Sequence, residues 1–345
     1  MFYLDENIIT YVDKHKYLGR ILNETLDYTV TTNVLSEAAG RSLGAVLNKL
    51  LHNSYLNFET YEKLYNSYVC PIVDYCSGIW RFRKYDKCIT VQNRALRAFL
   101  GVNRFTANAM IIGDTDWIQP SIRHKLSVIR LWNRLHAFDP SRLTKKAFVY
   151  DYNLKLNHTW CHDVKKILYE CGYHEYYDSF LPCTPIMDSL KQVLINKSKQ
   201  MWCSELVNQS KLRTYKTYKH NVGKELYIKI GLSRYHRSLL ERLRSCTLPL
   251  MVETGRYTNV KYEDRKCKIC YTDHVEDEEN LIFYCDGYIG ERVLFFSKIS
   301  NYCTNFINFS MPEKLCYLFS NEFVIKLLVN YLSQIINIRS QKIFQ

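Results

Sequence analysis

Apolar residues recur at spacings of three and four along most of the chain, which is the period of an amphipathic helix. This pattern predicts a helix after residue 27 and further helices over residues 58–69, 89–100, 121–138 and 323–338. Pro71 is expected to end the second helix and Gly101 to cap the third. Two short β-type runs, Ile8–Val12 and Tyr17–Leu22, flank polar residues 13–16 and predict a hairpin with its turn there.

The pattern therefore predicts a mainly α fold. We expect a helical bundle with a small N-terminal β-hairpin, a short cysteine-containing segment, and little further sheet apart from a short ribbon near 260–285. The helical pattern becomes less regular after residue 150, and turn-prone, cysteine-rich sequence begins near residue 246. These changes predict four consecutive regions, 1–30, 31–150, 151–245 and 246–345.

Composition excludes several classes of protein. The 345 residues are 47% hydrophobic and 14% aromatic, so intrinsic disorder is excluded as the main state. No membrane contact is expected, because the longest apolar run, 327–338, is too short and too polar to cross a bilayer. The acidic residues Asp5 and Glu6 argue against a secretory signal, so the thirteen cysteines are expected as reduced thiols in the nucleus or cytoplasm.

Positive charge is concentrated in two segments. The formal net charge is +13, and residues 81–104 hold seven basic residues and one acid, while residues 211–244 hold ten basic residues and two acids. Basic residues interleaved with tyrosines, as at Tyr215 and Tyr218, suit a phosphate backbone with occasional base stacking. The alternative is that these charges are solvated helix faces.

The most specific local chemistry lies near the C-terminus. Cys267 and Cys270 have the spacing of a pair that holds a tetrahedral metal from one side, and Cys285 follows. His274 is the best fourth candidate by sequence, ahead of nearby carboxylates. Zinc is the expected metal, and the alternative is three thiols left from a degraded site.

Several segments, in order along the chain, resemble the C-terminal part of reverse transcriptases of non-long-terminal-repeat (LINE-type) retrotransposons. The end of the family's palm resembles Tyr17-Leu18-Gly19-Arg20-Ile21-Leu22. The thumb segment that follows it is similar to Pro71-Ile72-Val73-Asp74-Tyr75-Cys76-Ser77-Gly78-Ile79-Trp80. The next helix is similar to Val91-Gln92-Asn93-Arg94-Ala95-Leu96-Arg97 and Leu100-Gly101-Val102. The zinc-binding segment and its surroundings are resembled by Leu243-Arg244, Leu248-Pro249-Leu250, Glu253-Thr254-Gly255-Arg256-Tyr257, Arg265-Lys266-Cys267, Cys270, Glu276-Asp277-Glu278, Cys285, Tyr288 and Arg292. The resemblance makes the four regions a palm end, a thumb, a basic connector and a degenerate zinc-binding segment.

Two departures from the family limit what the resemblance implies. The family's zinc histidine falls on Asn280, which is a poor ligand, and no Asp-Asp dipeptide is present to hold the two Mg²⁺ ions of a polymerase. We therefore expect no polymerase activity and no Mg²⁺ site.

The function expected first is weak, sequence-nonspecific binding of RNA or DNA. The best backbone contacts are Arg81, Arg83, Arg94 and Arg97 in the first segment and Lys211, Arg213, Lys216 and Lys219 in the second. Tyr215 and Tyr218 are the candidates for base stacking. The alternative is a decayed transposon remnant without activity. A metalloenzyme is the weakest hypothesis, because no constellation of carboxylates and histidines suggests an open metal site.

Overall fold

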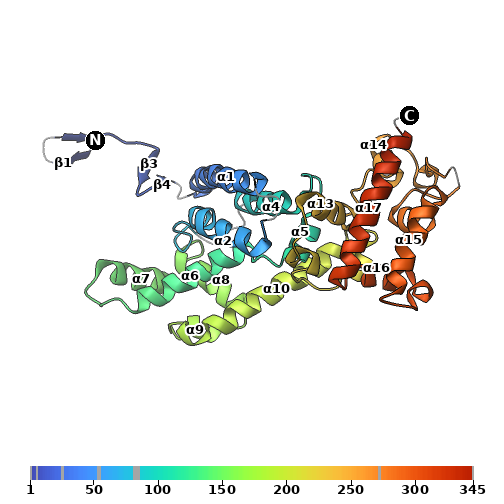
Figure 1. Ribbon diagram of the computed structural model, residues 1–345. Helices are drawn as coiled ribbons and strands as arrows, with labels where there is room; N and C mark the ends of the chain where they lie inside the picture. The colour runs from blue at the N-terminus through green and yellow to red at the C-terminus, as the bar shows by residue number, and fades with distance from the viewer. Residues whose placement is uncertain are drawn as a thin grey trace. The chain divides into compact units, whose positions relative to one another are not determined.

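The computed structural model describes residues 2–4, 7–24, 27–52, 56–80, 86–270 and 273–343. These residues are mainly helical, with two-stranded antiparallel hairpins near the N-terminus (Figure 1). Three cysteines cluster in the C-terminal part of the chain. The predicted fold class is confirmed. The predicted ribbon near 260–285 is reduced to an isolated antiparallel bridge between Lys266 and Val275.

The hairpin turn lies elsewhere than predicted. β1 (Phe2–Leu4) pairs with β2 (Asn7–Ile9), and β3 (Lys14–Tyr17) pairs with β4 (Arg20–Asn23). Residues 14–16, predicted as a turn, therefore belong to a strand. The second turn is Leu18-Gly19, where φ is +47° and +79°. A two-residue hairpin turn favours positive φ at both positions, which glycine adopts at little cost, and this preference outweighs the polar character of residues 13–16.

The chain forms two compact units, each assembled from separate segments. Unit 1 contains residues 1–46, 64–92 and 118–196, and unit 2 contains residues 47–63, 93–117 and 197–345. The division falls within the four helices α1 (Thr29–His52), α2 (Phe58–Tyr68), α4 (Asp86–Leu100) and α10 (Met187–Val207). It differs from the four consecutive regions expected from the sequence.

Unit 1 is built around a core that spans residues 122–194 and so continues across the boundary predicted at residue 150. Besides the hairpins, its elements are α3 (Cys70–Val73), α6 (Pro120–His136), α7 (Leu143–Leu154), α8 (Trp160–Glu170), α9 (His174–Asp178) and the 3₁₀ turn η1 (Thr184–Ile186). Trp132 of α6 is fully buried and donates its indole N–H to the Leu181 carbonyl at 2.8 Å. Phe148 and Phe180 pack edge-on against its ring, so the amphipathic stripe predicted for 121–138 organises this core.

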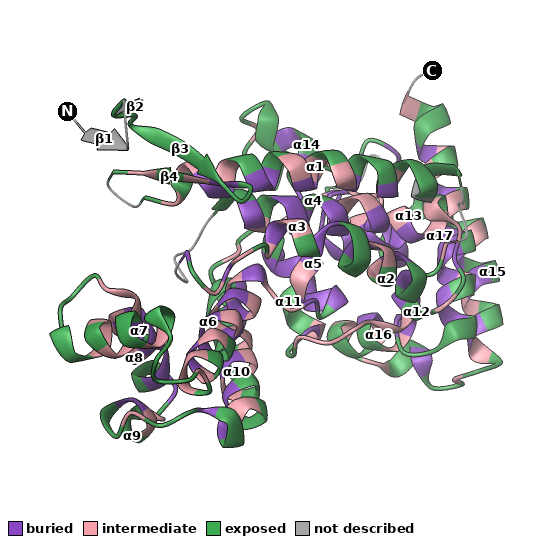
Figure 2. Cartoon of the chain, turned by 90° about the vertical axis from the view of Figure 1, so that its left-hand side faces the viewer, coloured by how far each residue is buried: buried purple, intermediate pink, exposed green. Residues whose placement is uncertain are grey.

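Unit 2 holds the C-terminal helices and the residues of the candidate site. Its elements are α5 (Asn108–Thr115), α11 (Tyr215–Tyr218), α12 (Leu226–Lys229), α13 (Arg234–Arg244), α14 (Met251–Tyr257), η2 (Tyr262–Asp264), the π-helical turn η3 (Asn280–Tyr284), η4 (Asp286–Tyr288), α15 (Ile289–Ser300), η5 (Phe306–Asn308), α16 (Met311–Leu318) and α17 (Glu322–Ile343). Both α5 and one side of α17 are buried (Figure 2). Among the described helices, no single one is long and apolar enough to span a membrane, although α16 and α17 pass that test as a pair across a 102° bend.

Candidate metal centre and nucleic-acid interface

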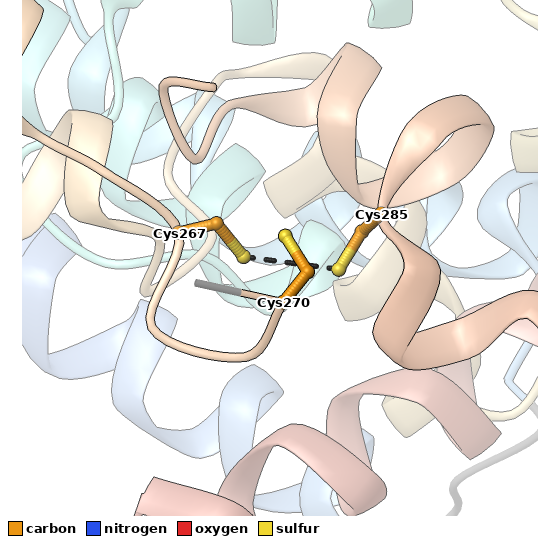
Figure 3. Close-up of side chains that lie close together, drawn as sticks. All are labelled: Cys267, Cys270 and Cys285. Atoms are coloured by element: carbon orange, nitrogen blue, oxygen red, sulfur yellow. Dashed lines mark hydrogen bonds between the residues drawn. The ribbon is translucent and has the colours of Figure 1, made fainter. Parts of the chain in front are cut away.

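Three cysteine sulfurs converge in unit 2. The Sγ atoms of Cys267, Cys270 and Cys285 all lie within 4.8 Å of one another, and those of Cys267 and Cys285 are 3.7 Å apart. Zinc–sulfur bonds of about 2.3 Å at tetrahedral angles would separate two sulfurs by about 3.8 Å. The three side chains point toward a common centre (Figure 3). This cluster could hold a metal ion, as the sequence predicts.

The backbone around the cluster explains how these cysteines meet. The Cys267 N–H donates to the His274 carbonyl at 3.1 Å, and the Glu276 N–H donates to the Arg265 carbonyl at 2.9 Å, so the ends of the Cys267–Cys270 loop are held together. The Cys285 N–H donates to the Asn280 carbonyl at 2.8 Å, the i to i+5 contact of a π-helical turn. These bonds bring two distant cysteine segments to one point.

The thiols of Cys267 and Cys285 are hydrogen-bonded to each other. The Cys285 thiol donates to the Cys267 sulfur, and this hydrogen bond lowers the pKa of Cys267 to about 6. The same contact raises the pKa of Cys285. Burial alone would raise both values, so the proximity of the sulfurs determines the direction for Cys267.

His274 is not part of the sulfur cluster, which corrects the predicted ligand set. Its side chain is exposed, and the group of mutually close ligand atoms contains only the three cysteines among the described residues. His274 contributes its backbone carbonyl instead, because the bridge between Lys266 and Val275 fixes the chain at this point. Asn280, where the resemblance places a histidine, is buried, and both its amide atoms lack a hydrogen-bond partner among the described residues.

The carboxylates considered as poorer ligands have other partners. Glu276 is buried and accepts from Arg339 at 2.7 and 2.8 Å and from the Met251 N–H at 2.7 Å. Asp277 accepts from the Asn280 N–H at 2.8 Å. These bonds tie α17 and α14 to the cysteine segment, so the acidic residues have structural roles.

In the second basic segment, most of the candidate contacts have acidic partners within unit 2. Lys211 pairs with Glu253 at 2.5 Å, and Arg213 pairs with Glu278 at 2.6 Å. Lys219 is buried and pairs with Glu225. These three were predicted to contact phosphates, but their charges are already compensated by acids, two of which lie outside the segment. Lys216 is exposed.

The predicted stacking tyrosines are also engaged. Tyr215 is fully buried and donates its hydroxyl to Asp114 at 2.7 Å, so it has no face for a base. Tyr218 stacks on Phe319 with ring centroids 5.4 Å apart. The stacking role is therefore wrong for Tyr215, because its ring forms part of the core.

The first basic segment keeps one exposed candidate among the described residues. Arg81 and Arg83 lie outside the described residues. Arg94 is exposed on α4. Arg97 is half-buried and donates to the Thr106 carbonyl at 2.8 Å and to Asn108 Oδ1 at 2.5 Å, while burial lowers its pKa. Arg97 thus stabilises the end of its helix rather than projecting freely.

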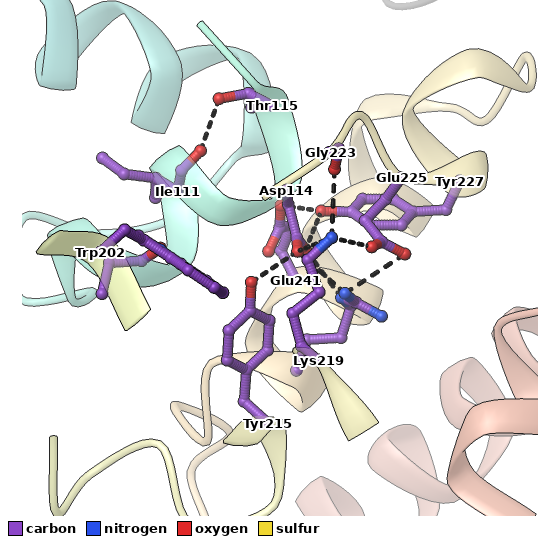
Figure 4. Close-up of polar contacts among 12 residues, drawn as sticks. Ile111, Asp114, Thr115, Trp202, Tyr215, Lys219, Gly223, Glu225, Tyr227 and Glu241 are labelled. Atoms are coloured by element: carbon purple, nitrogen blue, oxygen red, sulfur yellow. Dashed lines mark hydrogen bonds and ion pairs between the residues drawn. The ribbon is translucent and has the colours of Figure 1, made fainter. Parts of the chain in front are cut away.

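Asp114, which the sequence analysis did not single out, is the centre of a buried polar network (Figure 4). Its carboxylate is fully buried and accepts from Tyr215 at 2.7 Å and from Tyr227 at 2.9 Å. It also accepts two hydrogen bonds from Arg244, at 2.8 and 2.9 Å. The paired geometry between a guanidinium and a carboxylate is the strongest of the common ion-pair arrangements. The Asp114 side chain therefore joins α5 to three other elements of unit 2, α11, α12 and α13.

Glu241 extends this network. It is fully buried, and burial together with the charge of Asp114 raises the pKa of Glu241 well above its ordinary value. The Tyr227 hydroxyl contacts both Glu241 and Asp114, yet it carries a single proton. Both contacts are satisfied when Tyr227 donates to Asp114 and protonated Glu241 donates to Tyr227.

Comparison with known proteins gives no match. No family model fits the sequence, and no significant match is found among curated proteins or solved structures. The resemblance to a LINE-type reverse transcriptase thus depends on the segments quoted above and stays a prediction.

Proposed function

We propose that this chain is a non-catalytic C-terminal part of a LINE-type reverse transcriptase and that it binds RNA or DNA weakly and without sequence preference. The observation that carries the binding proposal is the positive excess of +13. Each internal ion pair removes one positive and one negative charge, so pairing in the second basic segment leaves that excess unchanged. The uncompensated cations must lie elsewhere, where they favour a polyanion through counterion release.

Binding is tested by the salt dependence of affinity for duplex and single-stranded DNA and RNA of random sequence. We expect the logarithm of affinity to fall linearly with the logarithm of salt concentration. Arg94→Gln should reduce the slope by about 0.9 if this exposed side chain contacts one phosphate of duplex DNA. Lys211→Gln is the matched control, because Lys211 is already paired with Glu253. The slope of log affinity against log salt should not change in this variant.

The proposed metal is a structural zinc ion held by Cys267, Cys270 and Cys285. Cysteine thiolates are ligands that zinc prefers, and cysteine-rich zinc sites in proteins are typically structural. The test is the metal content of the purified chain. Cys267→Ser should lose the metal, whereas Cys316→Ser, an exposed thiol elsewhere in unit 2, and His274→Ala should both keep it. Loss of zinc in His274→Ala would make His274 the fourth ligand, as expected from the sequence.

The alternative proposal is a folded remnant without a partner. It is favoured by Asn280 standing at the family's histidine position with both amide atoms unpartnered among the described residues, as expected of a site under decay. A chain that carries no zinc and binds DNA and RNA no better than a neutral protein of similar size would support this alternative. Template-dependent nucleotide incorporation by the purified chain would contradict both proposals.

A further inference from the structure

A third basic region lies in unit 1. Residues 123–166 contain ten basic residues and only three acids. The acids are engaged locally: Asp139 accepts from the N–H and hydroxyl of Ser141, Asp151 accepts from the Cys161 N–H at 2.9 Å, and Asp163 is buried. As in the second basic segment, some cations pair with acids outside the region: Arg123 with Asp74 at 2.7 Å and Lys125 with Glu170 at 2.8 Å.

Four of these cations form a patch at the turn between α6 and α7, called here the corner patch: Arg130, Arg134, Arg142 and Lys146. Arg130 and Arg134 lie on α6, Arg142 is the N-cap residue of α7, and Lys146 lies in the first turn of α7. The residues of each pair are four positions apart, which is about one helical turn or 6 Å along the axis. All four side chains are exposed. Within the described residues, no acidic side chain forms an ion pair with any of them.

An aromatic ring joins the two helices of the corner patch. The guanidinium carbons of Arg134 and Arg142 lie 5.7 and 4.8 Å from the centre of the Phe138 ring. The ring therefore draws two like charges from different helices toward one point, where they repel each other. An anion bound between them would relieve this repulsion.

We propose that the corner patch binds the phosphate backbone of RNA or DNA. This inference rests on the proposed function and assigns it a site. Three of the four cations are arginines, whose planar guanidinium donates two parallel hydrogen bonds to a phosphate. The buried side of the same helix, with Ile129 and Trp132 in the core, holds the patch rigidly.

Nucleic acid is favoured over a lipid surface as the partner. A helix that lies on a membrane needs an apolar face available for insertion beside its basic face. In α7 the apolar Phe148 is buried in the core of unit 1. On α7 the exposed Leu143, Tyr150 and Leu154 share one face at spacings of seven and four. In α6, however, which carries Arg130 and Arg134, no large apolar side chain is exposed, so these two arginines have no apolar face beside them.

The test compares two fourfold variants with the same net charge. The patch variant carries Arg130→Gln, Arg134→Gln, Arg142→Gln and Lys146→Gln. The control variant carries Lys63→Gln, Lys191→Gln, Lys229→Gln and Lys298→Gln, all at exposed positions outside the patch. If all four patch cations contact duplex phosphates, the slope of log affinity against log salt should fall by about three to four units in the patch variant.

The outcomes separate this inference from the proposed function. A large loss of slope in the patch variant, with a loss below about one unit in the control, supports the corner patch. Equal losses in both variants, or none in either, would overturn it while nucleic-acid binding by the parent stands. A parent that binds no nucleic acid overturns both. Binding of the parent to vesicles of anionic phospholipid, lost in the patch variant and unmatched by any DNA or RNA, would make lipid the partner.

Discussion

Replacing Asp114 by asparagine should destabilise unit 2 strongly while keeping the shape of the side chain. The substituted side chain would lack the negative charge that faces Arg244, whose guanidinium is buried beside it. In the parent, Tyr215, Tyr227 and Arg244 all donate hydrogen bonds to Asp114. The NH₂ group of asparagine is itself a donor, so it would face a hydroxyl or guanidinium donor and form no hydrogen bond with it. The result is a buried cation with an incomplete partner.

The magnitude follows from what remains near Arg244. Removing one partner of a buried ion pair costs about 3–5 kcal/mol. Glu225 Oε2 lies 3.4 Å from the Arg244 guanidinium and retains part of the compensation. We therefore expect the lower end, about 3 kcal/mol, which is a large share of the roughly 5–15 kcal/mol that stabilises a typical domain.

Asp116 provides the matched control two residues away. It is exposed, and its ion-pair contact is Lys199 at 3.8 Å, so Asp116→Asn should cost less than about 1 kcal/mol. The assay is urea unfolding at constant zinc, read as a change of midpoint at unchanged slope, with hydrogen exchange of the α5 and α13 amides to assign the loss to unit 2. Equal costs for the two variants would refute the role given to the buried pair.

The remaining predictions concern four positions. Glu241 has a folded-state pKa above its unfolded value, so stability falls as pH rises from about 4.5 through the folded pKa, by up to about 1.4 kcal/mol per pH unit. Glu241→Gln mimics the protonated acid, so urea unfolding should show an advantage over the parent that is absent near pH ~4 and grows toward pH ~8. Gly113→Ala would place Cβ 2.6 Å from the Trp202 ring, so it should lower the free energy of unfolding by about 1–3 kcal/mol or more. Gly40→Ala in α1 has open space around the new Cβ and should raise the free energy of unfolding by about 0.4–1 kcal/mol, read by thermal unfolding. Asn280→His should raise zinc affinity at least about tenfold in a chelator competition, and unchanged affinity would show that residue 280 does not face the metal.

Local pattern was enough to predict several of the longer helices and the cysteine cluster. The stripe over 121–138 appears as α6, and the helix predicted from residue 323 appears as α17 (Glu322–Ile343), because an apolar face in water must be buried and its period fixes the helix. Cys267 and Cys270 are close in sequence, so their chemistry could be recognised without the fold. The position of His274 could not, since it depends on a backbone bridge between Lys266 and Val275.

The buried network had a weaker signal in the sequence. Asp114 follows Met110-Ile111-Ile112-Gly113, and a lone carboxylate after an apolar run is a candidate for a buried, paired charge. Its partners could not be named, because Tyr215 and Arg244 are more than a hundred positions away. Long-range ion pairs of this kind are fixed by tertiary packing alone.

The same limit explains why counting charge along the sequence does not show which cations are free of acidic partners. A window from residue 211 to 244 counts cations but omits Glu253, Glu278 and Asp114, which lie outside it and neutralise three of them. Pairing leaves the total charge of +13 unchanged, so the sequence predicts correctly that excess cations exist somewhere on the chain. Where they lie depends on which acids are engaged by other partners. In residues 123–166, Arg123 and Lys125 are likewise paired, with Asp74 and Glu170. The four cations of the corner patch are exposed and form no ion pair among the described residues, so they are the charge that the proposed site would offer to a polyanion.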